Sequence, residues 1–92
     1  MTTTVVNKYK EHGDVSIMRP GPWGNPFIIG KDGSRAEVIA TFRIWFKNSA
    51  DKRAVWMRAH IHELKDKRLE CCCKPKICHG DVLAEVADKI YD

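Results

Sequence analysis

All four cysteines of this 92-residue chain lie within residues 71–81, together with His79 and Asp81. A thiol beside an imidazole can act as a nucleophile, with the imidazole moving a proton and a carboxylate orienting the ring. Cysteine and histidine are also the commonest zinc ligands. The stretch therefore predicts a thiol and imidazole site or a metal site, and it does not name a substrate.

A strand before this stretch and a helix after it would position these side chains. Residues 69–73 form a short run, apolar at most positions and bounded by Lys-Pro, as a buried strand would be, and apolar residues recur at helical spacing through residues 82–90. The helix would begin near Cys78, where unpaired backbone N–H groups and the helix dipole favour negative charge.

The helix start makes Cys78 the candidate nucleophile. Lys74 and Lys76 would add positive charge and stabilise a thiolate, and His79 would assist it or shuttle protons. Asp81 would orient the imidazole or cap the helix. We therefore expect Cys78 to be the most reactive thiol, with Cys78, His79 and Asp81 as catalytic residues. The alternative is a small buried cysteine, with His79 and Asp81 acting only as N-terminal caps.

Zinc is the alternative cofactor. Alternation along a strand would place Cys71 and Cys73 on one face, so that they could join Cys78 and His79 in a set of four ligands. The spacing is unusual, because structural zinc sites normally use two ligand pairs that are separated by a longer segment. We therefore expect reduced, metal-free cysteines and no resident cofactor.

Residues 19–27, Arg-Pro-Gly-Pro-Trp-Gly-Asn-Pro-Phe, contain three prolines and two glycines and predict a rigid loop. In a binding site, Arg19 would hold an anion, Trp23 would stack on a planar group, and Asn25 would hydrogen-bond to it. Gly80 would add backbone donors at the helix start. The alternative is a structural loop whose aromatic side chains Trp23 and Phe27 fill the core.

Together these two motifs predict one pocket. We expect Trp23 and Cys78 to lie on the same concave surface, with the Trp-Gly-Asn-Pro-Phe loop and the Cys-His-Gly-Asp turn as its two sides. The predicted ligand is a small anionic or nucleotide-like molecule, which Cys78 could process. Whether the protein is an enzyme stays open.

The remaining residues predict a single α/β domain over 1–92. Residues 5–9 and 15–18 predict a β-hairpin, in which Gly13 would take a positive φ. Ser34 and Glu37 form a capping box before one helix, and a second helix is expected over 52–67. The resulting order is β-β-loop-α-α-β-α: a small sandwich of about three helices on mainly one face of a short mixed sheet, of three strands or of four if residues 27–29 pair.

Composition narrows the class of protein. The chain is 43% hydrophobic and 30% charged, and it contains no apolar run near the roughly 20 residues that span a bilayer. The N-terminus lacks the pattern of a signal peptide, so we expect a cytoplasmic protein with no membrane partner. The formal net charge is +4, but basic and acidic residues are interleaved. The rival function is a non-catalytic module, with or without zinc, that binds nucleic acid or a host protein. No oligomeric state is predicted.

The order of the motifs resembles a known family. Arg19-Pro20 is followed by Trp23-Gly24-Asn25-Pro26-Phe27, and then by Leu69-x-Cys71-x-Cys73-x-Pro75-x-x-Cys78-His79-Gly80-Asp81-x-Leu83. This combination is similar to the domain of unknown function 4326 of bacteria and their phages, with Cys72 where that family often has Trp. The C-terminal half is more weakly similar to the domain of unknown function 488. The resemblance implies that a site exists and assigns no activity to it.

Overall fold

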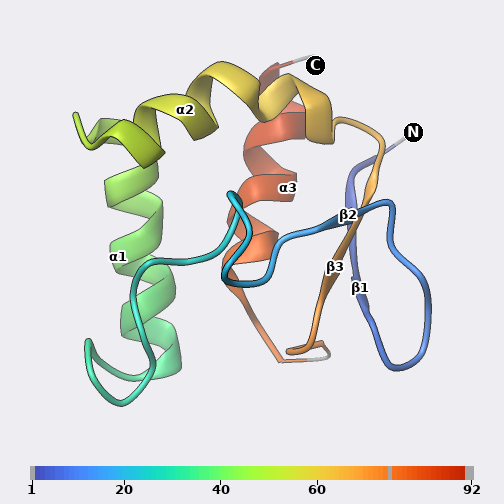
Figure 1. Cartoon of the computed structure of the whole chain (residues 1–92), viewed down its shortest axis with the longest axis horizontal. Helices are drawn as coiled ribbons and strands as arrows, with labels where there is room; N and C mark the ends of the chain where they lie inside the picture. The colour runs from blue at the N-terminus through green and yellow to red at the C-terminus, as the bar shows by residue number, and fades with distance from the viewer. Residues whose placement is uncertain (1, 75, 91–92) are drawn as a thin grey trace.

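Short strands and helices follow one another in the predicted order. The elements are β1 (Thr4–Asn7), β2 (Val15–Ser16), α1 (Arg35–Asn48), α2 (Lys52–His60), η1 (the 3₁₀ helix Ile61–Leu64), β3 (Arg68–Cys71) and α3 (His79–Ile90) (Figure 1). The computed structural model describes residues 2–74 and 76–90. The prediction of an α/β domain with three α-helices and a three-stranded sheet is confirmed. The segment 27–29 is not a strand.

The sheet is parallel throughout, so the predicted hairpin and mixed sheet are wrong. Strand β3 is central, and both β1 and β2 run parallel to it in the order β1-β3-β2. Val5 and Val15 are both register partners of Leu69, one on each side. Residues 8–14 therefore carry the chain from one edge of β3 to the other, instead of folding back on β1.

Gly13 is required in this crossing because it lies against β3, and not because of the positive φ that the sequence suggested. A Cβ atom at Gly13 would be 2.6 Å from the Cβ atom of Glu70. The Gly13 N–H donates to Oε2 of Glu70 at 3.0 Å, and the Asp14 N–H donates to the Arg68 carbonyl at 2.7 Å. The described glycines with positive φ are instead Gly30 and Gly33, in the turn before α1.

The two middle helices begin at side-chain caps. Ser34 and Glu37 form the predicted capping box at the start of α1. Asp51 caps α2 by accepting a hydrogen bond from the Arg53 N–H. The predicted second helix is shorter than expected: α2 ends at His60, and η1 continues to Leu64.

The core lies between α3, the sheet and α1. Leu69 and Cys71 of β3 point to the same side and are buried, whereas Glu70 between them is only half-buried. Helix α3 contacts β1 and β3 on one side and α1 on another (Figure 1). The apolar residues that fill this space from the helices are Val38, Phe42, Phe46, Ala54, Met57, Val82, Leu83 and Ala87. The helices therefore cover mainly one face of the sheet, as predicted.

Within residues 2–74 and 76–90, no helix has the length and apolar character needed to cross a membrane.

Candidate ligand-binding pocket

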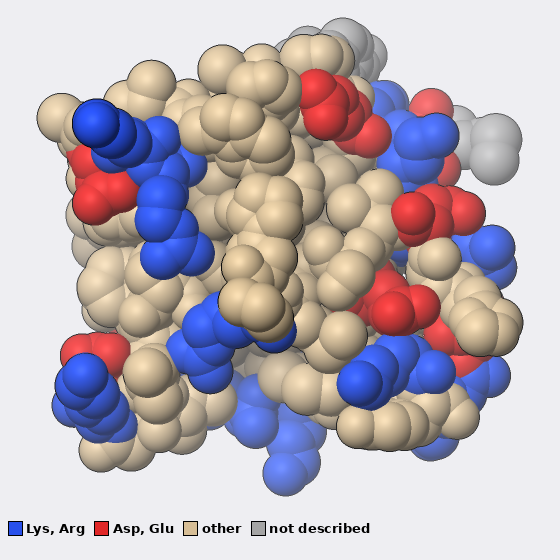
Figure 2. All heavy atoms as spheres, viewed as in Figure 1, with Lys and Arg blue, Asp and Glu red and all other residues tan. Residues whose placement is uncertain are grey.

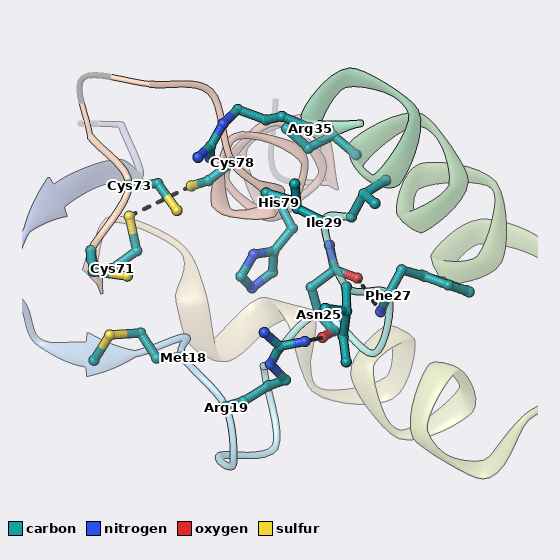
Figure 3. A pocket seen from close by; sticks show the side chains of 14 residues that line it. Met18, Arg19, Asn25, Phe27, Ile29, Arg35, Cys71, Cys73, Cys78 and His79 are labelled. Atoms are coloured by element: carbon teal, nitrogen blue, oxygen red, sulfur yellow. Dashed lines mark hydrogen bonds between the residues drawn. The ribbon is translucent and has the colours of Figure 1, made fainter. Parts of the chain in front are cut away.

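An open pocket of about 230 Å³ lies between the loop after β2, the N-terminal end of α1 and the cysteine-containing turn (Figure 3). Its walls are mostly apolar, and they include residues of both sequence motifs. The lining residues are Met18, Arg19, Asn25, Phe27, Ile28, Ile29, Arg35, Val38, Ile39, Cys71, Cys72, Cys73, Cys78 and His79. The fold thus brings Arg19 and Asn25 together with Cys78 and His79, which are more than fifty residues away in the sequence.

Trp23 does not line the pocket, so its predicted role as a stacking wall is wrong. The side chain is 4% exposed, and its ring centroid lies 5.0 Å from that of Trp56. The bulky indole fills the core, as the alternative interpretation of the loop proposed. The neighbouring Phe27 is half-buried, lines the pocket and packs edge-on against Trp45.

His79 is held by two backbone carbonyl groups of the same loop. Its Nε2 donates to the carbonyl oxygens of Ile17 at 2.9 Å and Trp23 at 3.0 Å. Its ring also packs edge-on against Phe42, with centroids 5.2 Å apart. Burial lowers the pKa of His79, and the nearby positive charge of Arg19 acts in the same direction. The imidazole is therefore neutral at pH 7, with its proton on Nε2.

Asp81 caps α3 and does not contact the imidazole. One of its oxygens accepts the Cys78 N–H at 3.1 Å, and the other accepts Lys74 Nζ at 2.9 Å. The same hydrogen bond raises the pKa of Lys74. Capping was one of the two predicted roles of Asp81; the orienting role is wrong. The carboxylate also occupies the position at the helix N-terminus where a ligand anion would otherwise bind.

Gly80 is buried and does not line the pocket, so it is not the predicted ligand-binding residue. A Cβ atom at this position would be 2.4 Å from Cδ1 of Ile17 and 3.2 Å from both Cys78 Sγ and Val5 Cγ2. Glycine is required here because α3 packs closely against the strands.

Cys78 is buried beside Cys71, which contradicts the prediction of an exposed thiolate. Its side chain is 3% exposed, and its Sγ lies 3.6 Å from Sγ of Cys71. Burial, reinforced by the neighbouring Cys71 thiol, raises the pKa of Cys78 to about 12. The partial positive charge at the start of α3 does not offset this rise in the pKa of Cys78. The exposed thiol is that of Cys72, which lies just beyond the end of β3.

The four proposed zinc ligands are not assembled for metal binding. Cys71 and Cys78 are adjacent, and the hydrogen bonds of Nε2 leave His79 only Nδ1 as an atom that could bind a metal. Across the described ranges 2–74 and 76–90, no group of three or more His, Cys, Asp or Glu residues is placed to hold a metal ion.

Arg35 is the charged pocket residue that the sequence analysis missed. It is the first residue of α1, and its Nη1 donates to the Ile77 carbonyl at 3.1 Å across the pocket edge. A positive charge in the first turn opposes the helix dipole, so Arg35 is misplaced for helix stability. That mismatch was the signal available in the sequence.

On the face shown in Figure 2, basic side chains are scattered among acidic ones and do not form a continuous stripe. The charge around the pocket is different. Its lining includes Arg19 and Arg35, and no Asp or Glu is among the described residues that line it.

Comparison with known proteins agrees with the motifs. The model of the domain of unknown function 4326 matches residues 3–89. The chain belongs to this family. It is 42% identical over 88 residues to an Enterobacteria phage T4 protein described as "Uncharacterized 12.4 kDa protein in nrdA-td intergenic region", covering 95% of this chain and 79% of that protein. No solved structure matches the chain.

Membership of the domain of unknown function 4326 family confirms the resemblance, whereas the weaker similarity to the domain of unknown function 488 stays a prediction. Pro75 of the family motif lies outside the described residues. Neither the family description nor the phage relative states an activity.

Proposed function

We propose that this protein binds a small anionic, nucleotide-like ligand in the pocket between Arg19 and Arg35. The observation that carries the proposal is the pairing of two guanidinium groups, from different elements, on one mainly apolar cavity that has no acidic lining residue among those described. A ligand with a negatively charged group and a flat apolar part would satisfy both features.

The two arginines approach the pocket from different sides. Arg19 belongs to the loop after β2 and Arg35 to α1, and in Figure 3 the Arg35 side chain lies above the His79 ring and that of Arg19 below it. Nη1 of Arg19 donates a hydrogen bond to the backbone carbonyl of Asn25 at 3.3 Å, and Nη1 of Arg35 donates one to the backbone carbonyl of Ile77. Because a guanidinium carries five N–H donors, both retain donors for a phosphate or a carboxylate.

Apolar side chains at the rim support a ligand with a flat apolar part. Ile28 is 40% exposed and Ile29 is 48% exposed, and both line the pocket beside Phe27. A bound ring system would remove this apolar surface from water, and each Å² of apolar surface buried would favour binding by about 25 cal/mol. The volume of about 230 Å³ is below the range of roughly 300–1,000 Å³ that is usual for drug-sized ligands, which favours a compact ligand.

Binding is a better proposal than thiol catalysis. With its pKa raised to about 12, the buried Cys78 thiol is almost entirely protonated at neutral pH. His79 donates Nε2 to carbonyl groups and Asp81 caps a helix, so the two do not form a relay with the thiol. We therefore propose no step in which Cys78 attacks the ligand.

The test is isothermal titration calorimetry with nucleoside 5′-monophosphates and phenyl phosphate. We expect Arg19→Met and Arg35→Met each to weaken binding at least about tenfold, because each removes a charge-assisted hydrogen bond. Arg43→Met is the matched control, because Arg43 lies on α1, pairs with Glu85 and is outside the pocket. An absence of binding to every probe, or an equal loss in the Arg43 variant, would contradict the proposal.

The rival function, a module for nucleic acid or a host protein, is distinguished by the same variants. Binding to nucleic acid through the surface would weaken when salt is added and when any exposed basic residue is substituted. Binding in the pocket depends instead on two particular arginines.

A cytoplasmic location stays a prediction.

A further inference from the structure

His79 presents its second ring nitrogen to the pocket. The residue lines the cavity, and Nδ1 has no hydrogen-bond partner among the described residues, since both of the ring's hydrogen bonds are made by Nε2. Within the described chain, no buried side-chain nitrogen or oxygen atom that is closed to solvent lacks a partner. Nδ1 is therefore accessible, and the accessible space beside His79 is the pocket.

The hydrogen-bond character of Nδ1 follows from the other side of the ring. The Ile17 and Trp23 carbonyl oxygens can only accept, so the proton is on Nε2. Burial lowers the pKa of His79, which keeps the ring neutral and leaves a lone pair on Nδ1. Nδ1 is therefore a hydrogen-bond acceptor.

The other polar side chains of the lining offer mainly donors. Arg19 and Arg35 have no acceptor, and Oδ1 of Asn25 already accepts the Phe27 N–H at 2.9 Å. Among the described lining side chains, Nδ1 of His79 is thus the one nitrogen or oxygen acceptor that makes no hydrogen bond, whereas Oδ1 of Asn25 has one of its two lone pairs occupied. Arg19 and His79 line the same pocket, so a compact anion held there by Arg19 would share the cavity with this acceptor.

We propose that His79 is a specificity-determining residue, which selects anions that carry their own hydrogen-bond donor, such as a phosphate monoester with one proton. This inference rests on the proposed function, since it assumes that an anion occupies the pocket. A fully ionised anion of the same shape would set an oxygen lone pair against the lone pair of Nδ1 and leave this acceptor without a partner and without water.

Phenyl phosphate and phenyl sulfate test this selection at about pH 5.5, below the second pKa of phosphate monoesters at about 6. Both probes are then mainly monoanions with the same ring, but only the phosphate has an O–H group. We expect wild-type protein to bind phenyl phosphate at least about tenfold more tightly. In His79→Phe, which keeps an aromatic ring against Phe42, the two affinities should become equal.

A measurement on the unaltered protein keeps the inference testable if His79→Phe does not fold. Nitrogen-15 NMR of the His79 ring in the free protein at about pH 7 should show a protonated Nε2 and an unprotonated Nδ1, and Nδ1 should shift when phenyl phosphate is added. A protonated Nδ1 would overturn the inference. Equal binding of both probes, weakened by Arg35→Met, would overturn it while leaving the proposed function intact. If neither probe binds, the proposed function fails, and the inference fails with it.

Discussion

The Sγ atoms of Cys71 and Cys78 lie 3.6 Å apart, and both side chains are almost completely buried. The two thiols therefore belong to the packed interior beneath the pocket, although the sequence placed Cys78 at an exposed helix start. Burial raises the pKa of Cys78, whereas the Cys72 side chain is exposed and Cys73 is half-buried.

This arrangement predicts the order in which the thiols react. Limiting iodoacetamide near neutral pH should label Cys72 first and Cys73 second, and it should label Cys71 and Cys78 last, because alkylation needs an accessible thiolate. Fragment-ion mass spectrometry resolves the adjacent sites. In urea all four should react at similar rates. Labelling of Cys78 before Cys72 in the folded protein would contradict the structure.

His79 predicts a pH dependence of stability. Because burial lowers its pKa below the ordinary value of 6.5, the unfolded chain takes up a proton at a higher pH than the folded protein does. The free energy of unfolding should therefore fall as pH drops below about 6.5, by at most about 1.4 kcal/mol for each pH unit. Urea unfolding at several pH values measures this slope.

The matched variant for this prediction is His79→Gln, whose amide nitrogen can still donate to the Ile17 and Trp23 carbonyl groups. It should lose the contribution of His79 to the slope. The carboxyl groups whose pKa is lowered titrate in a more acidic range, near or below their ordinary values of 3.8 for Asp and 4.5 for Glu; they are Asp14, Glu37, Glu85 and Asp88. An unchanged slope in His79→Gln would show that His79 is not the group responsible.

Gly80 predicts a steric coupling with Ile17. Gly80→Ala should destabilise the protein by about 1–3 kcal/mol, because its Cβ would be 2.4 Å from Cδ1 of Ile17. Ile17→Val removes this Cδ1 atom at a cost of about 0.5–1.5 kcal/mol. The double variant should therefore be more stable than the sum of the two single effects predicts. Strict additivity in urea unfolding would contradict the close contact.

Local patterns in the sequence predicted the elements well. The Ser34 and Glu37 capping box, the apolar stripe of α1 and the start of α3 near Cys78 each depend on neighbouring residues. The strand pairing could not be predicted in the same way. A chain that reverses after β1 and one that crosses β3 have the same local composition, and the close contact between Gly13 and Glu70 distinguishes them only in three dimensions.

The site was predicted only in part, because the contacts of its residues also depend on parts of the chain that are distant in the sequence. The two motifs do meet at one pocket, and Arg19, Asn25, Cys78 and His79 line it. The environment of each residue depends on remote partners. Trp56 packs against Trp23. Val5 of β1 and Ile17, directly after β2, pack over Gly80, next to the buried Cys78. Spacing within the motif could not reveal these contacts.

The central claim, an anion held between Arg19 and Arg35, is tested most directly by the NMR signals of the arginine side chains. When phenyl phosphate is titrated into nitrogen-15-labelled protein, we predict that the Nε–H signals of Arg19 and Arg35 shift together with one dissociation constant, while that of Arg43 stays in place. If Arg19 and Arg35 do not move, or if Arg43 and other exposed arginines shift equally, the pocket is not the anion site.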